Sequence, residues 1–367
     1  MCWIPGYGGE RYAPTRGKRD VTDTARRIPQ DGTKSAAPLL RIRDLAVQFE
    51  TRQGLARVLE GVNLDICRGE IAGLVGETGC GKSVLARSIL RIIPQPPGRI
   101  SQGRILLDGR DLLQLSAAQL RRVRGREISM IFQEPMTSLN PVFTVGNQMQ
   151  EIVRLHQCMD RKEARAVCLD MLAQVNLPDA REILRKYPHE LSGGMRQRVM
   201  IAMELSCHPR LLIADEPTTA LDVTVQGQVL TILKTLAGRH QVSILLITHD
   251  MGVVAQLCDR VAVMYAGQIV EQAGVEHLFA HPAHPYTRGL IGAIPSLEGE
   301  SALLQTIEGS VPPPTQVPPG CRFHPRCPHR FSPCSREVPP LEAIDSAHAV
   351  ACHLFASRQG AQHGPAD

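Results

Sequence analysis

The stretch that most constrains this chain is Gly76-Glu77-Thr78-Gly79-Cys80-Gly81-Lys82-Ser83. It reads glycine, four residues, glycine, lysine and serine, and it stands between the apolar run Ile71–Val75 and a helical pattern over residues 83–93. Glycines at these positions let several backbone N–H groups converge on one point. The N-terminus of the following helix adds positive potential at the same point. A strand, such a loop and a helix in succession are typical of a cradle for nucleotide phosphates.

Two side chains of this loop are predicted to act directly. Lys82 can reach the β- and γ-phosphates, and the hydroxyl of Ser83 can bind Mg²⁺. The other six residues of the loop are predicted to bind the nucleotide as well. A chance glycine-rich turn is the alternative, but the strand before it and the helix after it argue against that. Cys80 is interpreted as a small space-filling residue rather than a redox switch.

A second apolar run, residues 211–214, ends in the carboxylates Asp215 and Glu216. Asp215 is predicted to hold Mg²⁺ through water, as in Walker B sites. Glu216 is predicted to be the base that polarises the attacking water. A strand end that merely meets solvent would carry the same residues. Because a phosphate loop stands in the same chain, however, hydrolysis of a nucleoside triphosphate is the better hypothesis.

The other short apolar runs fix the fold class. Residues 40–49 approximate the alternation of a strand, and residues 128–132 and 244–247 read as buried strands between helical segments. This pattern predicts an α/β unit with a largely parallel sheet, whose ligands bind at the carboxyl ends of the strands.

The chain divides into three predicted parts. A tail of low apolar content covers residues 1–37, and a nucleotide-binding domain covers residues 38–295, with a helical subdomain at about 140–200. A Pro- and Cys-rich module covers residues 296–367. No internal repeat is present, so one nucleotide domain is expected.

Composition narrows the class of partner. The net charge of +5 on 367 residues is a mild bias, and only 4% of the residues are aromatic. Single-strand nucleic-acid binding usually needs aromatic stacking platforms, so no nucleic-acid partner is predicted. No apolar run approaches the roughly 20 residues that span a bilayer, and residues 1–38 lack the apolar core of a signal peptide. These features predict a cytosolic protein that reaches a membrane only through a partner.

A sharper motif is the string Leu191-Ser192-Gly193-Gly194-Met195-Arg196-Gln197. It resembles the signature of ABC ATPases. Gln133, at a strand end, is similar to the Q-loop of that family, Ala220-Leu221-Asp222 to its D-loop, and His249 to its switch histidine. With the phosphate loop and the acidic strand end, these motifs stand in the family's order within residues 38–270. The resemblance implies a P-loop NTPase with a RecA-like mixed, mainly parallel sheet and an ABC helical subdomain.

The resemblance also implies roles and cofactors. The family uses ATP and Mg²⁺, and two subunits clasp two ATP molecules head to tail. Gln133 would touch Mg²⁺ and the attacking water, and His249 would hydrogen-bond the γ-phosphate. The signature and D-loop would meet the nucleotide of the other subunit, with contacts assigned to Ser192, Gly193, Gly194, Gln197 and Asp222. The family's adenine-stacking aromatic is missing. Its position falls near Arg52 or Gln53, and Phe49 is the nearest aromatic, so the adenine contact is left open.

Two further stretches point to one branch of the family. Residues 134–141, Glu-Pro-Met-Thr-Ser-Leu-Asn-Pro, and residues 284–287, His-Pro-Tyr-Thr, resemble oligopeptide and dipeptide importer ATPases. Residues 284–287 resemble the start of the C-terminal extension of those ATPases. Nickel and glutathione importers share this extension, so nickel and glutathione remain alternative substrates. The resemblance implies a second ATPase subunit, the same or different, two membrane permeases and a solute-binding protein. It also implies a peripheral place on the cytoplasmic face of the inner membrane.

Two other classes compete with an importer. A soluble ABC ATPase of translation or DNA maintenance usually has two nucleotide domains or a long coiled-coil insertion, and neither is present. A module that binds ATP without hydrolysis would not need the four polar residues of the predicted catalytic set, which are all intact: Lys82, Asp215, Glu216 and His249.

Four of the eleven cysteines gather near the end of the chain: Cys321, Cys327, Cys334 and Cys352. The gaps between them are five, six and seventeen residues, without the paired Cys-x-x-Cys of zinc ribbons. Four thiolates also suit a [4Fe–4S] cluster, which some relatives are thought to carry. A cluster, zinc and a metal-free module are therefore kept as alternatives.

Overall fold

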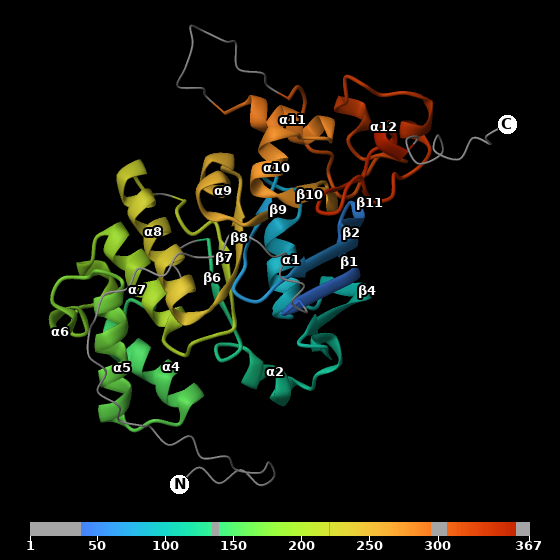
Figure 1. Cartoon of the computed structure of the whole chain (residues 1–367). Coiled ribbons are helices and arrows are strands. Elements are labelled where there is room, and N and C mark those ends of the chain that lie inside the picture. The colour runs from blue at the N-terminus through green and yellow to red at the C-terminus, as the bar shows by residue number, and fades with distance from the viewer. Residues whose placement is uncertain (1–37, 134–138, 220, 295–306, 357–367) are drawn as a thin grey trace, which may run out of the picture. The chain divides into compact units, whose positions relative to one another are not determined.

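The computed structural model describes residues 38–133, 139–219, 221–294 and 307–356. The predicted tail at 1–37, most of the stretch 134–141 and Ala220 of the D-loop string lie outside the described residues. The described residues form two sheets with helices around them (Figure 1).

An eight-stranded sheet carries the order β11-β12-β10-β9-β3-β8-β7-β6. Strands β9, β3, β8, β7 and β6 pair in parallel, whereas β10, β12 and β11 pair antiparallel. This confirms the predicted α/β fold with a mixed, mainly parallel sheet. The bounds are β3 (Ile71–Val75), β6 (Ile128–Ile131), β7 (Leu211–Asp215), β8 (Ser243–Thr248), β9 (Arg260–Tyr265), β10 (Gln268–Gly274), β11 (Glu342–Ala343) and β12 (Ala349–Val350).

The parallel strands are buried on both faces, which explains why their sequences are apolar without interruption. Along β7, Leu212 and Ala214 belong to one hydrophobic core, and Leu211 and Ile213 belong to the other. Only at the strand's carboxyl end does the chain leave these cores. The polar residues that follow each strand therefore collect along one edge of the sheet.

A smaller antiparallel sheet packs into the second of these cores. Its order is β2-β1-β4-β5, with bounds β1 (Leu40–Thr51), β2 (Gly54–Ile66), β4 (Gly98–Leu107) and β5 (Arg110–Asp111). The alternation over residues 40–49 correctly predicts β1, although bulges beside Leu45 shift its register against both neighbours. The short helices η1 (Leu112–Gln114) and α2 (Ala117–Val123) follow β5.

Helices follow the strands in two groups. The first group lies together on one side of the sheet (Figure 1): α4 (Val145–Gln157), α5 (Arg161–Gln174), α6 (Ala180–Ile183), η2 (Pro188–Glu190) and α7 (Gly193–Leu205). These helices fill the stretch for which a helical subdomain is expected, and the division into domains stays a prediction. The other group contains α1 (Lys82–Ile89), α8 (Val223–His240), α9 (Met251–Leu257), α10 (Val275–Ala280) and α11 (Pro285–Gly292).

The C-terminal segment joins the large sheet directly. β12 pairs with β10, where Glu271 lies opposite Val350, and β11 pairs with β12 at the sheet edge. The rest of this segment is mostly irregular, with the short helices η3 (His324–Arg326), η4 (Ser332–Ser335) and α12 (His353–Ala356). Phe323 packs into the hydrophobic core that also contains Leu212 and Ala214, where its ring contacts those of Tyr265 and Tyr286.

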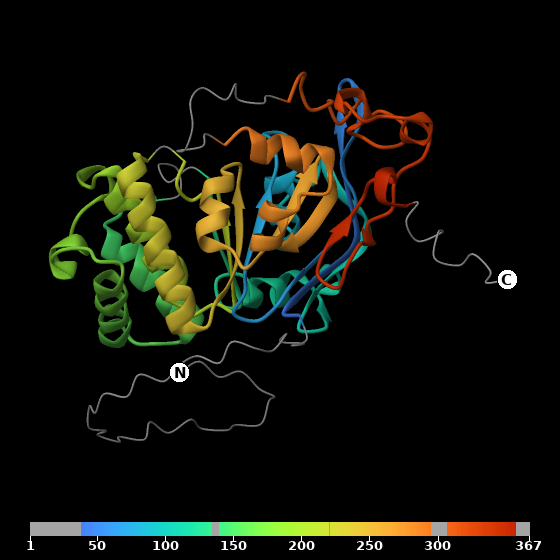
Figure 2. The same cartoon turned by 45° about the horizontal axis from the view of Figure 1, so that its top comes forward.

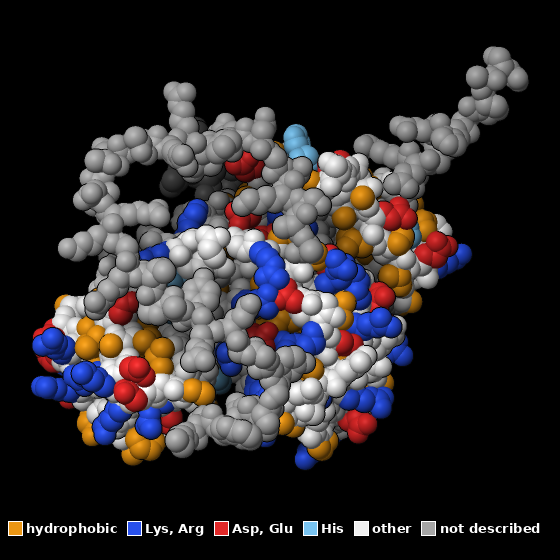
Figure 3. All heavy atoms as spheres, turned by 60° about the horizontal axis from the view of Figure 1, so that its bottom comes forward, with side chains coloured by type: hydrophobic (Ala, Val, Ile, Leu, Met, Phe, Trp, Pro, Cys, Tyr) orange, Lys and Arg blue, Asp and Glu red, His pale blue; other side chains and the backbone are white. Residues whose placement is uncertain are grey.

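The surface is mixed in charge. On the face shown in Figure 3, Lys and Arg side chains stand among Asp, Glu and apolar side chains rather than merging into one basic patch. Within the described ranges, every helix is too short or too polar to span a bilayer.

Candidate functional site

The phosphate loop connects β3 to α1 and depends on glycine. Gly76, Gly79 and Gly81 have φ angles of 155°, 84° and 109°, a region that other residues rarely adopt. The fit is tightest at Gly76, where a Cβ atom would lie 2.2 Å from the carbonyl oxygen of Met264. The loop therefore keeps its shape only with glycine at this position.

Lys82 folds back across the loop. Its Nζ donates hydrogen bonds to the carbonyl oxygens of Gly76 at 2.7 Å and Glu77 at 3.0 Å, and the residue is only 5% exposed. An ammonium group offers three donors and no acceptor. The charge is thus held inside the loop, next to the backbone N–H groups that face a bound phosphate.

Ser83 and Asp215 meet although 132 residues separate them. Ser83 Oγ donates a hydrogen bond to Asp215 Oδ1 at 3.1 Å. Burial raises the pKa of Asp215 above its ordinary value, and the bond from Ser83 works against that shift. A hydroxyl beside a carboxylate is the hard oxygen set that Mg²⁺ binds, so these two side chains fit the predicted magnesium site.

Glu216 receives three side chains. Gln133 Nε2 and Thr219 Oγ1 donate to its Oε2 at 2.9 and 3.0 Å, and His249 Nδ1 lies 3.2 Å from its Oε1. Burial raises the pKa of Glu216, but the hydrogen bonds from His249 and Thr219 outweigh burial and bring the pKa below its ordinary value. Glu216 is therefore a carboxylate at neutral pH. Its φ of 49° turns the chain sharply at the strand end.

Three strand ends supply this group. Gln133 follows β6, Glu216 follows β7 and His249 follows β8. The sequence motifs predict a role for these three but not for Thr219, which bonds back to Glu216 across a tight turn. The only signal was its position three residues after Glu216, in a run of two threonines.

Glu77 of the phosphate loop is held by Tyr286 of α11 and by Arg326 of the C-terminal segment. Its backbone N–H donates to Tyr286 Oη at 2.8 Å, and its carboxylate accepts from Arg326 Nη1 at 2.9 and 3.2 Å. Arg326 also donates to the carbonyl oxygens of Ile307 and Glu308. No motif of the sequence predicts a role for Arg326. Tyr286 was noted only within residues 284–287, which resemble part of the importer ATPases.

The signature string begins α7. Ser192 is the N-cap of the helix, and its hydroxyl accepts a hydrogen bond from the backbone N–H of Met195 at 3.3 Å. Ser192 and Gly193 are exposed, as a surface that meets another molecule requires. Helix α7 belongs to the helical group, apart from α1 and the chain's own phosphate loop in both ribbon views (Figures 1 and 2).

The remaining residues assigned to the signature and the D-loop differ in their surroundings. A Cβ on Gly194 would lie 2.7 Å from Val225 Cγ1, so glycine permits the close packing of α7 on α8. Asp222 is exposed and caps α8, accepting from the backbone N–H of Val225 at 2.9 Å. Gln197 is fully buried, and its side-chain nitrogen and oxygen have no hydrogen-bond partner among the described residues. The nucleotide contact predicted for Gln197 thus has no surface to act through in this conformation.

The position at which the family places its adenine-stacking aromatic falls at the turn between β1 and β2. Arg52 and Gln53 are exposed there. Phe49 packs over Gly98, where a Cβ would lie 2.6 Å from the ring. Phe49 is therefore a packed strand residue, and the adenine contact stays open, with stacking by Arg52 as one possibility.

The four C-terminal cysteines approach one another. Burial raises the pKa of the Cys352 thiol to about 11, and the neighbouring thiols of Cys321, Cys327 and Cys334 add to the shift. No three of their sulfur atoms, however, lie within 4.8 Å of one another. Sulfur atoms that share one zinc ion lie about 3.8 Å apart, so the arrangement does not match a mononuclear zinc site.

The site has a glycine loop on a helix N-terminus, a serine and an aspartate suited to Mg²⁺, and a carboxylate at the adjoining strand end. These features define a P-loop NTPase. Two family models match the chain: "ABC transporter" over residues 59–219 and "Oligopeptide/dipeptide transporter, C-terminal region" over residues 270–334. The chain belongs to the ATP-binding subunits of the oligopeptide and dipeptide ABC transporters. It is an ATP-hydrolysing transporter subunit that uses ATP and Mg²⁺.

Curated relatives agree over almost their whole length. The chain is 49% identical to the oligopeptide transport ATP-binding protein AppD of Bacillus subtilis, covering 88% of this chain and 98% of that protein. It is 47% identical to the dipeptide transport ATP-binding protein DppD of the same organism, covering 89% and 96%. For the oligopeptide transport ATP-binding protein OppD of Salmonella typhimurium, the identity is 46%, covering 90% and 97%.

Solved structures share the fold. The bacterial ABC transporter cassette MJ0796, solved as a dimer, has a TM-score of 0.58 and 25% identity, covering 64% of this chain and 98% of that one. The cbiO1 protein of Clostridium perfringens, part of the ABC transporter complex cbiONQ, has a TM-score of 0.57 and 28% identity, covering 66% and 91%. The fold prediction is thus confirmed for the ABC cassette.

Proposed function

We propose that this chain hydrolyses ATP at the carboxyl ends of β6, β7 and β8 and thereby drives peptide uptake through membrane permeases. One observation carries the assignment of the chemistry. Gln133, Thr219 and His249 converge on Glu216, within the same strand-end edge as the Ser83–Asp215 pair. Such convergence orients a carboxylate that must act on water.

Each residue has a defined task in this proposal. Lys82 exchanges its bonds to loop carbonyls for bonds to phosphate oxygens. Ser83 and Asp215 hold Mg²⁺, which neutralises phosphate charge when bound. Glu216 accepts a hydrogen bond from the attacking water, and His249 holds the γ-phosphate. Gln133 senses whether a nucleotide is present.

A second subunit completes the site. Ser192 and Gly193 are exposed at a helix N-terminus, which suits a γ-phosphate. Because α7 lies apart from the chain's own phosphate loop, these residues serve the nucleotide of a partner ATPase, identical or related. MJ0796, which shares the fold, has been solved as a dimer. The roles of Gly194 and Asp222 at that interface belong to the same proposal, whereas the buried Gln197 is left out of it.

The test of the base is Glu216→Gln, which keeps the shape of the side chain and removes its charge. We expect ATP binding to persist, turnover to fall at least about a hundredfold, and an ATP-bound dimer to accumulate on size-exclusion chromatography. Glu151→Gln, an exposed residue of α4, is the matched control. A Glu216→Gln protein that hydrolyses ATP at the wild-type rate would remove Glu216 from the mechanism.

Peptides are the proposed cargo because the curated relatives quoted above are named for oligopeptide or dipeptide transport. The alternatives are nickel and glutathione, or a role outside transport. A strain that lacks this chain should lose uptake of radiolabelled di- and oligopeptides and keep uptake of ⁶³Ni²⁺ and glutathione. Loss of nickel or glutathione uptake with peptide uptake intact would move the assignment to that cargo. Intact uptake of all three would favour a role outside transport.

The proposed assembly contains two permeases and an external solute-binding protein. This chain would then be peripheral, on the cytoplasmic face of the inner membrane. Fractionation is the test. The chain should sediment with membranes when the permeases are co-expressed and stay in the supernatant when they are absent.

We also propose a [4Fe–4S] cluster at Cys321, Cys327, Cys334 and Cys352. Their thiols are close enough to raise one another's pKa but are spaced wider than one zinc ion requires. Each thiolate of such a cluster binds a different iron, so a wider spacing suits it. Protein purified without oxygen should contain about four irons per chain and absorb near 400 nm. Anaerobic protein without iron would leave the module metal-free.

A further inference from the structure

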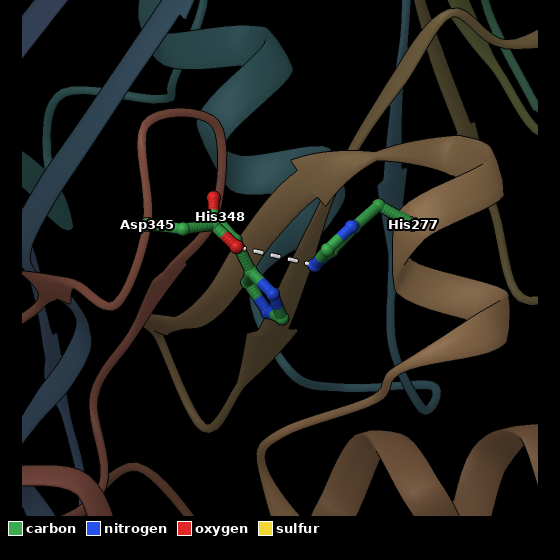
Figure 4. Close-up of side chains that lie close together, drawn as sticks. All are labelled: His277, Asp345 and His348. Atoms are coloured by element: carbon green, nitrogen blue, oxygen red, sulfur yellow. Dashed lines mark ion pairs between the residues drawn. The ribbon is translucent and has the colours of Figure 1, made fainter.

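Three polar side chains meet at the junction of α10 with the β11–β12 loop, and none of them belongs to the phosphate loop or to the ends of β6, β7 and β8. They are His277, Asp345 and His348 (Figure 4), and one potential ligand atom from each lies within 4.8 Å of the other two. His277 comes from α10, whereas Asp345 and His348 come from the loop before β12. Among the described residues, this is the one group of three such side chains that meets a metal-site spacing.

The buried member of the group, His348, is held from behind. Its Nε2 lies 2.7 Å from Oε1 of Glu271, a fully buried residue of β10. That carboxylate also accepts the backbone N–H groups of Ala283 and His284, which fixes its position. A histidine whose far nitrogen is bonded to a carboxylate is the usual arrangement behind a metal ligand, because the carboxylate sets the tautomer and orients the ring.

The other nitrogen of His348 is unpaired. Nδ1 is buried, the residue is 2% exposed, and Nδ1 has no hydrogen-bond partner among the described residues. A buried polar atom without a partner is unfavourable, so its retention needs a cause. With Nε2 bonded to Glu271, Nδ1 is an imidazole lone pair available to a ligand.

The two exposed residues, His277 and Asp345, already place their ligand atoms at the distance expected for two ligands of one metal ion. His277 Nε2 lies 3.2 Å from Asp345 Oδ2. Two ligand atoms on one tetrahedral zinc ion lie about 3.3 Å apart, given metal–ligand distances near 2.0–2.1 Å. Both side chains are exposed, so their rotamers can adjust to bring Nδ1 of His348 to the same distance.

We propose that His277, Asp345 and His348 bind a divalent transition-metal ion of the zinc class, with solvent completing the coordination. Two imidazoles and one carboxylate favour Zn²⁺ or Co²⁺ over the hard ions Mg²⁺ and Ca²⁺. Glu271 is the carboxylate that orients His348. The bound ion joins α10 to the C-terminal segment, next to the pairing of β10 with β12, so its occupancy stiffens the attachment of that segment.

Co²⁺ is the probe, because its absorption spectrum distinguishes ligand types. Full-length protein is stripped of loose metal with EDTA and titrated with Co²⁺ in the absence of nucleotide. Binding at the proposed site gives weak visible d–d bands, without the intense sulfur-to-metal charge-transfer band that the cysteines would add. A stabilising metal should also raise the Tm of the wild type.

Two variants change exposed ligands and leave the buried core intact: His277→Gln and Asp345→Asn. Each should weaken Co²⁺ binding at least roughly tenfold and abolish the Tm increase. The control is His208→Asn, which removes an exposed histidine that also contacts another histidine, His240. Asn tolerates the φ of 50° at position 208, so this variant should bind Co²⁺ like the wild type.

Two results would overturn the proposal. One is wild-type protein that binds no Co²⁺. The other is binding that shows only the thiolate charge-transfer band and is equal in wild type, His277→Gln and Asp345→Asn. The second result would place the metal at the cysteines.

Discussion

The phosphate loop and the C-terminal segment differ in how their structure is encoded. The lysine of the loop bonds to neighbours in sequence: Lys82 bonds to Gly76 and Glu77, only six and five residues away. The C-terminal segment is held by long-range contacts, such as Arg326 to Glu77 across 249 residues and His348 to Glu271 across 77. A local pattern can therefore identify the loop, whereas only the fold brings the second set together.

The two regions also meet. Arg326 of the C-terminal segment bonds to Glu77, as does Tyr286 of α11, so the segment helps to brace the phosphate loop. This contact makes the comparison testable. Damage to the loop should affect chemistry, damage to the long-range contacts should affect stability, and damage at the meeting point should affect nucleotide affinity.

The largest effect is expected from Lys82→Ala. Its ammonium group is the charge that the loop keeps beside the phosphates, and loss of such an electrostatic contact lowers kcat by roughly 10²–10³-fold. Steady-state ATPase assays give the measurement, with Lys162→Ala on the exposed face of α5 as control. Wild-type turnover in Lys82→Ala would show that this lysine has no part in the chemistry.

The second effect is on stability, through Glu271→Gln. The buried carboxylate accepts from Ala283, His284 and His348, and an amide presents a donor where one of these donors points. We expect the free energy of unfolding to fall by about 2–3 kcal/mol, measured by urea denaturation. The exposed Glu276→Gln should change it by less than about 0.5 kcal/mol. Equal stability of both variants would show that the buried network adds nothing to the attachment.

The third effect tests the meeting point through Arg326→Ala. Without the guanidinium of Arg326, both carboxylate oxygens of Glu77 lose a hydrogen bond and the phosphate loop becomes more mobile. Binding of ATP must then order the loop. We expect KM for ATP to rise about tenfold, which corresponds to about 1.4 kcal/mol, with a smaller change in kcat. Arg330→Ala, in the same segment and exposed, is the control. A fall in kcat with KM unchanged would instead assign Arg326 to the transition state.

How much the sequence could predict follows the same division. The phosphate loop, the strand before it and the carboxylates Asp215 and Glu216 were predictable because each occupies a few consecutive residues. The convergence of Gln133 and His249 on Glu216 needed only the rule that parallel strands end at one edge. Gln197 shows the limit, since a motif position gives no information about whether its side chain is buried.

The contacts of Arg326 and the group around His348 had no local signal. Arg326 lies in an irregular Cys- and Pro-rich string, where no helical or strand period indicates which side chain turns inward. Between His277 and Asp345 stand 67 residues, and the pairing of β12 with β10 brings them together. Such pairing depends on the packing of the whole sheet, which the composition of a two-residue strand cannot reveal.

The smallest effect is expected from Thr219→Val, which removes a local contact to Glu216. The hydroxyl of Thr219 is one of the groups that lower the pKa of Glu216, so its removal raises that pKa. In the wild type, the lowered pKa keeps Glu216 charged as the pH falls. In Thr219→Val, Glu216 should lose its charge at a higher pH than in the wild type. The acid limb of the kcat/KM profile should move to higher pH, with only a few-fold loss of activity at neutral pH.

The control for this shift is Thr231→Val on α8. The hydroxyl of Thr231 donates to the carbonyl oxygen of Gly227 within the same helix and is not among the groups that shift the pKa of Asp215 or Glu216. Its pH profile should match the wild type. An acid limb that stays in place in Thr219→Val would mean that Thr219 has no part in setting the protonation of Glu216. The turn after β7 would then serve the shape of the site but not its chemistry.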